Sequence, residues 1–331
     1  MAKEQRPATA LERAIRSQPE ELARIAAQTP VHAAVERLHR AHRIWLVGTG
    51  TSQHAAELGA AMLNEAGRAA QAVPSMHFVT WAPHVAQHDG VVVISHNAGD
   101  ETAYAATARL QSLEAGLRVV SITRQGRGLP EAVETVPKEQ SHTYTASYTG
   151  ALMILAKIAA EMGAESFSTE ALAAVSGAAS LAIADSGVDA IAQPNRLLVI
   201  AGLGPASVTA REGALKVREA ARFPAEGYDA EYLLHGSAVP LAAEDRLVLV
   251  APPDDDGFLP AMAKAAEGAG VPTSMVTEPS NLPPLLAQIP LTIRLQLLAL
   301  RYATERGFDP DLVIDGPWAD ETLWTIGAPK L

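Results

Sequence analysis

The chain has 331 residues, of which 48% are hydrophobic, so it is long enough to bury the cores of two ordinary domains. Its net charge of −11 disfavours binding to a nucleic-acid backbone, because such binding depends on lysine and arginine. The absence of cysteine excludes disulfide bonds, thiolate zinc sites and a cysteine nucleophile, and it fits a reducing cytoplasm.

Residues 10–40 are expected to form helices. Leu11 and Ile15 begin an apolar series near helical spacing with charges between its members, and Pro19 and Pro30 are expected to punctuate these helices. The N-terminal segment has no apolar signal core, and apolar runs throughout the chain stay shorter than about 18 residues. We therefore expect no membrane span and a cytoplasmic location.

Three short, β-branched runs predict strands at residues 43–48, 90–95 and 117–123. Such apolar runs suit a parallel sheet that is buried on both faces. A helical stretch at 102–113 separates the second and third runs, and a long helical stretch follows at 147–163. This alternation of strands and helices predicts a doubly wound α/β domain.

A second set of strands is predicted at residues 195–202, 245–252 and 271–277, and another long helical stretch follows at 291–307. The two sets share one offset of 154 residues, which relates the glycine pairs after their first strands: Gly48 and Gly50, Gly202 and Gly204. Self-similarity at a fixed offset indicates a duplicated domain.

We therefore predict two tandem doubly wound parallel-sheet domains, both αβα sandwiches of the flavodoxin or Rossmann-like type. The predicted divisions are N-terminal helices at 1–40, a first domain at 41–165, a linker or helix at 166–190, a second domain at 191–311 and a C-terminal tail at 312–331.

Three loops of the first domain, at 48–52, 95–102 and 139–145, follow predicted strands or precede a helix and are rich in hydroxyls. Ligands of open α/β sheets bind beyond the carboxyl ends of the strands, and hydroxyl and N–H groups at helix starts can hold a phosphate. One such loop alone is better explained by ordinary helix capping, but three together favour a ligand site. The predicted phosphate-binding residues are Gly50, Thr51, Ser52, Ser95, His96, Asn97, Thr102 and Ser141, with Thr143 as a further hydroxyl.

No cofactor and no metal are predicted. The glycine turn lacks the third glycine of a dinucleotide-binding loop, because Gln53 stands at that place. His84 and His88 are four residues apart, but no third ligand accompanies them at a useful spacing.

Glu212, Lys216 and Glu219 are spaced to share one face of a helix. Charged residues at such spacing usually form a solvated stripe on the helix surface. Small residues at the neighbouring positions suggest close packing instead: Gly213, Ala214, Ala220 and Ala221. His235 follows in a Leu-Leu-His-Gly segment; a lone histidine is more often structural, but this one comes after a charged helix and an acidic, aromatic loop.

Four segments together resemble the sugar isomerase (SIS) domain family: GTGTS at 48–52, VVVIS at 91–95, EGALKVRE at 212–219 followed by HG, and LQLLALRYATERGFDPD at 295–311. The similarity extends over residues 10–311 and is greatest to double-SIS proteins, such as the isomerase half of glucosamine-6-phosphate synthase without its glutaminase domain. The EGALKVRE and HG pair is specific, whereas the glycine turn alone is not.

The resemblance implies that Glu219 moves a proton between C1 and C2 of a sugar phosphate and that Lys216 is its neighbouring cation. It also implies that His235 helps to open the sugar ring and is lent by a second subunit, so that a homodimer has composite active sites. Further possible members of the site are Glu139, Glu212, Glu226 and Asp320.

Two departures from the family pattern affect the expected chemistry. The loop at 95–102 is two residues longer than usual. Asp320 falls about where the synthase carries a lysine that forms a Schiff base, so imine-forming amination is not expected. The sequence favours a phosphosugar isomerase acting on a hexose or aminohexose 6-phosphate, and leaves open an accompanying deamination or deglycation. The alternative is a non-catalytic protein that senses a sugar phosphate.

Overall fold

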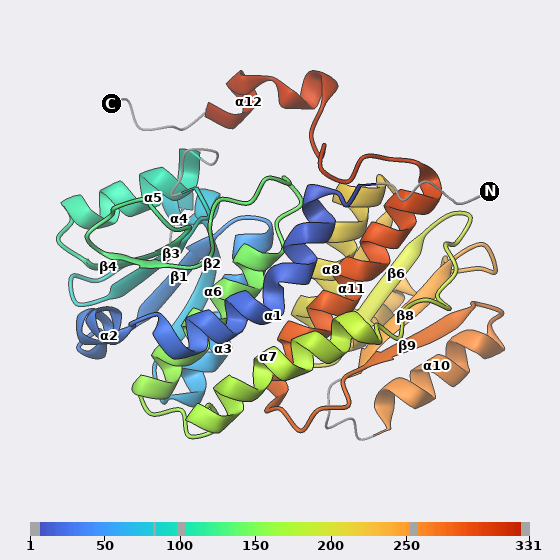
Figure 1. The fold of residues 1–331 in the computed structure, drawn as a ribbon, viewed down its shortest axis with the longest axis horizontal. Coiled ribbons are helices and arrows are strands. Elements are labelled where there is room, and N and C mark those ends of the chain that lie inside the picture. Colours follow the sequence, from blue (N-terminus) through green and yellow to red (C-terminus); the bar gives the residue numbers. More distant parts are fainter. Residues whose placement is uncertain (1–6, 82–83, 98–102, 252–256, 326–331) are drawn as a thin grey trace.

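A computed structural model describes residues 7–81, 84–97, 103–251 and 257–325. The chain forms two parallel sheets with helices on both sides of each (Figure 1). The first sheet has the order β2-β1-β3-β4-β5 and the second has the order β7-β6-β8-β9. The prediction of two parallel α/β sheets is confirmed.

The strands are β1 Ile44–Gly48, β2 Ala70–Pro74, β3 Gly90–Ile94, β4 Arg118–Thr123, β5 Ala132–Glu134, β6 Leu198–Gly202, β7 Ala225–Asp229, β8 Arg246–Ala251 and β9 Thr273–Thr277.

The helices are α1 Ala10–Gln28, α2 His32–His39, α3 Thr51–Glu65, α4 Ser75–Trp81, α5 Ala103–Glu114, α6 Ala146–Glu161, α7 Thr169–Ala184, α8 Pro205–Ala221, α9 Ala230–Tyr232, α10 Phe258–Gly268, α11 Pro284–Arg306 and α12 Glu321–Thr325. A π-helical turn, η1, covers Leu233–Ser237, and a 3₁₀ turn, η2, covers Gly316–Ala319. Within the described ranges, no helix is both long and apolar enough to cross a membrane.

The main hydrophobic core lies between the two sheets, where α1, α3, α6, α7, α8 and α11 are packed (Figure 1). Successive side chains of a strand point to opposite faces, so β1 contributes to two cores. Ile44 and Leu46 join the main core, while Trp45 and Val47 join a separate core on the outer face, beneath α5. The chain thus stacks its two sheets on a shared layer of helices.

The strand–turn–helix unit at the start of each sheet has the same local geometry. Gly50 before α3 and Gly204 before α8 have φ of 53° and 57°, a region that favours glycine. A Cβ on Gly48 or Gly202 would overlap a carbonyl oxygen of the first helical turn that follows. The glycine pairs spaced 154 residues apart therefore serve the same close passage from strand to helix in both halves.

Two details of the predicted elements were wrong. Pro19 lies inside α1 and does not interrupt it. A proline cannot donate to the carbonyl four residues before it, but the Gln18 side-chain amide donates to that carbonyl, Ile15 O, at 3.2 Å. The segment after α8, described as a loop from its sequence, begins with strand β7.

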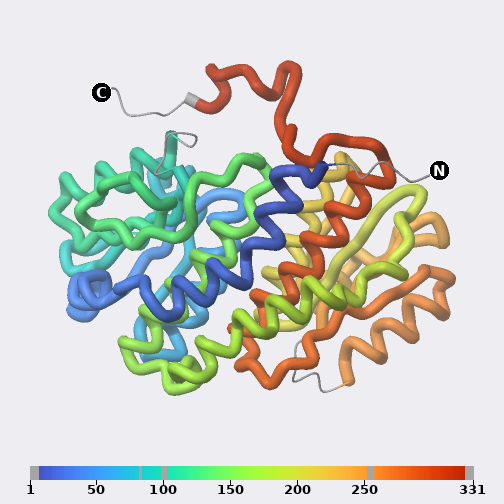
Figure 2. Tube along the Cα trace, viewed as in Figure 1, coloured from blue at the N-terminus to red at the C-terminus, as the bar shows by residue number. Residues whose placement is uncertain are grey.

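The C-terminal tail leaves the end of α11 and passes back to the side of the first sheet (Figures 1 and 2). Its start is fixed by several hydrogen bonds. The Asp311 carboxylate accepts from the N–H groups of Ala10 and Leu11, both at 2.7 Å, at the N-terminus of α1. Arg222 donates to Asp315 at 2.8 Å. These contacts hold the tail where its later residues can reach the ends of the strands.

Candidate functional site

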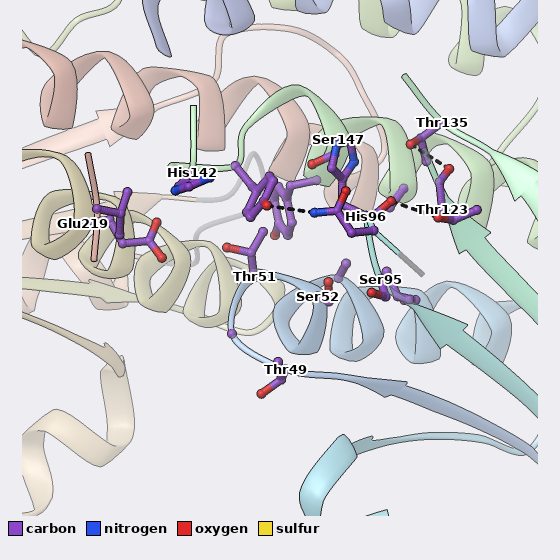
Figure 3. A pocket seen from close by; sticks show the side chains of 18 of the residues that line it. Thr49, Thr51, Ser52, Ser95, His96, Thr123, Thr135, His142, Ser147 and Glu219 are labelled. Carbon is purple, nitrogen blue, oxygen red and sulfur yellow. Dashed lines mark hydrogen bonds between the residues drawn. The ribbon is translucent and has the colours of Figure 1, made fainter. Parts of the chain in front are cut away.

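A cavity of about 810 Å³ opens at the carboxyl ends of β1, β3 and β4, where ligands of such sheets bind (Figure 3). The glycine turn and first turn of α3 form one wall, and the loop after β3, the start of α6 and the tail form others. Glu219, at the end of α8, brings a carboxylate from the second half of the chain. The site is therefore built from both halves.

Six of the eight predicted phosphate-binding residues line this cavity: Gly50, Thr51, Ser52, Ser95, His96 and Asn97. Thr102 lies outside the described residues. Among the described residues, the lining includes no lysine and no arginine. An anion held here would depend on hydroxyl groups, N–H groups and the N-terminus of α3.

The hydroxyl of Thr51 is already engaged by ionic side chains. It donates to Glu212 Oε1 at 3.2 Å and accepts from Lys216 Nζ at 3.0 Å. Because a hydroxyl has one proton to donate, Thr51 in this arrangement cannot also donate to a phosphate. Ser52 and Ser95 are therefore the better candidates for that contact.

Ser141 does not reach the cavity, contrary to the prediction. Its side chain is fully buried, and its hydroxyl lies 3.5 Å from Pro310 O, to which Thr143 also donates at 2.8 Å. The residues between and after them, His142 and Tyr144, line the cavity instead. Side chains alternate along this segment, and the prediction selected the residues that face away from the cavity. The hydroxyls of Ser141 and Thr143 contact the tail at Pro310 instead.

Glu139 has a structural contact rather than a place in the cavity lining. Its carboxylate accepts from the N–H groups of Thr145, Ala146 and Ser147 at 2.8–3.3 Å. A negative charge is stabilised at a helix N-terminus, so Glu139 caps α6. This side chain occupies the start of α6, leaving the start of α3 as the better position for an anion.

Glu212, Lys216 and Glu219 form a buried ionic row instead of a solvated stripe. The side chains of Glu212 and Lys216 have no exposed area, and that of Glu219 is 20% exposed. Lys216 Nζ lies 3.4 Å from Glu212 Oε1 and 2.6 Å from Glu219 Oε2. Lys216 thus connects an interior carboxylate to one that faces the cavity.

The interior position shifts all three pKa values. Burial raises the pKa of Glu219 above its ordinary value, and the nearby Lys216 reduces this effect without cancelling it. Burial also acts to raise the pKa of Glu212, but Lys216, His54 and Thr51 outweigh it and lower that pKa. Burial alone would lower the pKa of Lys216, but the two carboxylates raise it. Lys216 therefore remains a cation, and Glu219 is the carboxylate of this row whose pKa is raised.

Three other candidate residues lie outside the cavity lining. The side chain of His235, in η1, is 76% exposed and lies 4.0 Å from Glu231. Glu226, on β7, accepts from the Tyr228 hydroxyl. Asp320 accepts from the backbone N–H and hydroxyl of Thr322 at 2.9 and 2.8 Å, at the start of α12.

Several residues at the site could not be identified from the sequence. The tail contributes Val313, Ile314, Ala319, Glu321 and Trp324 to the cavity wall, and α6 contributes Ser147 and Tyr148. His54, outside the cavity lining, contacts Glu212 at 2.6 Å. The only signal for His54 was its place in the first turn after the glycine loop; its partner is 158 residues away in sequence. No group of three or more candidate metal ligands occurs among the described residues.

One family model matches part of the chain, and solved structures of other proteins share its fold. A family model for the SIS domain matches residues 37–128. No curated protein sequence matches the chain. Glucosamine-6-phosphate deaminase from Thermotoga maritima has the same fold, with a TM-score of 0.74, 18% identity and coverage of 92% of this chain and 97% of that one.

Two further solved structures extend this fold match. The C-terminal domain of glucosamine-fructose-6-phosphate aminotransferase from Francisella tularensis has a TM-score of 0.73, 20% identity and coverage of 94% and 100%. Tagatose-6-phosphate ketose/aldose isomerase from Escherichia coli has a TM-score of 0.76, 21% identity and coverage of 94% and 97%. More than nine-tenths of the chain therefore shares its fold with these proteins, and residues 37–128, which include most of the first sheet, match the SIS-domain family.

Proposed function

We propose that the protein is a phosphosugar isomerase that transfers a proton between C1 and C2 of a hexose or aminohexose 6-phosphate. We also propose that the second half of the chain is a second SIS domain. The observation that carries the proposal is the position of Glu219, which is paired with a buried lysine and lines the same cavity as Ser52 and Ser95 (Figure 3). The solved structures of the same fold include enzymes named for sugar 6-phosphates.

In the proposed reaction the phosphate binds at the start of α3, near Ser52 and Ser95, and so orients the open-chain sugar. The Glu219 carboxylate removes the proton from C2 of the aldose, the C–H electron pair forms the C1–C2 double bond, and O1 takes up a proton. Glu219 then returns its proton to C1 while O2 loses one, which gives the ketose. The partner subunit's copy of His235 is proposed to assist at the sugar oxygens, and Lys216 to stabilise the charge that develops nearby.

Exchange of the C1 or C2 proton with deuterated water tests this proposal. With a panel of hexose and hexosamine 6-phosphates, at least one compound is expected to exchange, as followed by NMR and mass spectrometry. Because Glu219 must be ionised to act, and burial raises its pKa, the rate should fall on acidification with a midpoint above the ordinary glutamate value of about 4.3. Amine release in the same samples would reveal an accompanying deamination or deglycation. If sugar phosphates bind and none of them exchanges its proton, the proposed isomerase activity is refuted.

Replacing Ser52 and Ser95 together by alanine is expected to weaken binding of sugar phosphates by at least about tenfold, since two hydrogen bonds to a charged group are lost. Isothermal titration calorimetry measures the affinity. Ser180→Ala is the matched control, because this exposed hydroxyl on α7 donates only to the Ser176 carbonyl among the described residues. Unchanged affinity in a folded double variant would contradict the assignment of the phosphate position.

We also propose a homodimer in which η1 packs against the second subunit. Tyr232, Leu234 and Val239 are 69%, 52% and 84% exposed, an unusual cluster of apolar side chains around His235. Sedimentation velocity at micromolar concentration should detect a dimer, and Leu234→Asp should shift it towards monomer. Leu181→Asp, on a comparably exposed leucine of α7, should leave the dimer intact. A wild-type protein that is only monomeric would refute this proposal.

The second candidate function is a sugar-phosphate sensor without catalysis. The tail favours it in one respect, because the tail residues lining the cavity are apolar or acidic, with Trp324 and Glu321 at its end. Such a wall suits binding and exclusion of water more directly than covalent chemistry. Tight binding without proton exchange would favour the sensor, whereas exchange would favour the isomerase.

A further inference from the structure

His54 is a partly buried histidine that belongs to neither the predicted site nor the cavity lining. It lies in the first turn of α3, and its side chain is 13% exposed. Its Nδ1 is 2.6 Å from Glu212 Oε2 on α8. This contact joins the two halves of the chain at Glu212, which is itself in contact with Lys216.

The contacts of Glu212 continue from His54 to the cavity. The other carboxylate oxygen of Glu212, Oε1, lies 3.4 Å from Lys216 Nζ and accepts from Thr51 at 3.2 Å. Lys216 then donates to Glu219 Oε2 at 2.6 Å. The path from His54 to Glu219 therefore passes through two side chains with no exposed area, so water does not screen it or replace its contacts.

We propose that His54 is a positioning residue for Glu219, acting through the Glu212–Lys216 pair. The catalytic part of this proposal rests on the proposed function, whereas the coupling of His54 to Glu219 does not. Within the described residues, His54 is the hydrogen-bond partner of Glu212 Oε2. Without it, a buried carboxylate oxygen loses its donor, and Glu212 is free to rotate towards Lys216 and draw that ammonium group away from Glu219.

Charged groups surround His54 on two helices. On α8 it faces Glu212, with Lys216 and Glu219 farther along and Arg211 paired to Glu57 of α3. Tyr148 of α6 lies near Glu212 and Glu57. Removing the negative charge of Glu212 changes the direct partner of the His54 ring, and removing that of Glu219 changes the ring's surroundings through Lys216.

The NMR signals of the His54 ring test the coupling without any need for activity, and loss of a signal in His54→Asn assigns them. In Glu212→Gln the ring signals are expected to shift, because the directly hydrogen-bonded group changes. In Glu219→Gln a smaller shift is expected. The ring of His32, a 76% exposed residue near Glu36 and Glu161, serves as the internal control, and its signals should not move. His54 signals that are unchanged in Glu219→Gln would overturn the coupling.

Proton exchange tests the positioning role. His54→Leu is expected to lower the maximal exchange rate by roughly ten- to a hundredfold, a loss in the range caused by small misplacement of a reacting group, while KM for the sugar phosphate stays within about twofold. His54→Asn should restore much of the rate, because the Asn amide can donate to Glu212 as Nδ1–H does. Equal rates in both variants and wild type, or a rise in KM alone, would overturn the positioning role. No exchange in the wild type would reject the proposed function, and the NMR signals of the His54 ring would still decide the coupling.

Discussion

Replacing Glu219 by glutamine is expected to lower the rate of C1 or C2 proton exchange by at least about a hundredfold, the usual share of a general acid–base group. The amide has nearly the same shape as the carboxylate but cannot accept and return the proton. Lys216 would still have Glu212 and Thr51 as partners, so the fold and the phosphate affinity should be retained. Exchange by NMR and affinity by calorimetry separate these two effects.

Glu226→Gln is the matched control for this experiment. Glu226 is a glutamate of the same half of the chain, but it is exposed on β7 and contacts Tyr228 rather than the cavity. Its exchange rate should stay within about twofold of the wild type. Full exchange activity in Glu219→Gln would remove Glu219 from the mechanism. Loss of phosphate affinity in parallel with the rate would instead indicate a disrupted site.

Replacing Lys216 by methionine is expected to cost about 3–5 kcal/mol of unfolding free energy at neutral pH, because it leaves carboxylates without their buried cation. Lys216 has no exposed area and contacts both Glu212 and Glu219. Urea denaturation measures the loss. Lys264→Met, at an exposed position of α10, is the control and should change stability by no more than about 0.5 kcal/mol.

The pH dependence of the Lys216→Met variant follows from the same charges. Without the cation, burial should raise the folded-state pKa of Glu212 above its unfolded value. A carboxyl with a raised folded-state pKa destabilises the fold above the unfolded pKa, and this cost disappears as the pH falls and the group is protonated. The stability deficit should therefore shrink as the pH falls from neutral towards the unfolded pKa of about 4.3. The double variant Glu212→Gln, Lys216→Met should recover much of the deficit; a deficit unchanged by either treatment would refute this explanation.

The central strands of both sheets were predictable because they are buried on both faces and so carry uninterrupted apolar runs. β1, β3, β6 and β8 are such strands. The neighbouring edge strands β2 and β7 were not predicted. Each is mostly half-buried or exposed, and neither has an apolar run or a regular alternation to distinguish it from a loop.

The sequence indicated two of the candidate site's components by local rules. A glycine turn between a buried strand and a helix indicated a candidate anion position, and the 212–216–219 spacing indicated one helix face. Whether that face is buried or exposed could not be predicted from the sequence, because burial depends on what packs against the helix. α8 packs against α3 and α11, and this contact makes Lys216 an interior cation.

The sequence likewise did not show which side chains of the 139–145 segment face the cavity. Hydroxyls occur at positions 141 and 143, and the sequence alone favoured them as ligands. The path of the tail decided otherwise, because Pro310 O occupies the side on which both hydroxyls lie. His142 and Tyr144 consequently face the cavity.

By itself, the sequence determined the class of fold and the matching glycine turns of the two halves, because each follows from patterns within a short stretch. Only the tertiary structure decided that His54 meets Glu212 and that the tail closes the cavity with Trp324. Both contacts join residues far apart in the chain. Their formation depends on how two sheets share one layer of helices. The spacing of residues within a short stretch of sequence contains no information about that arrangement.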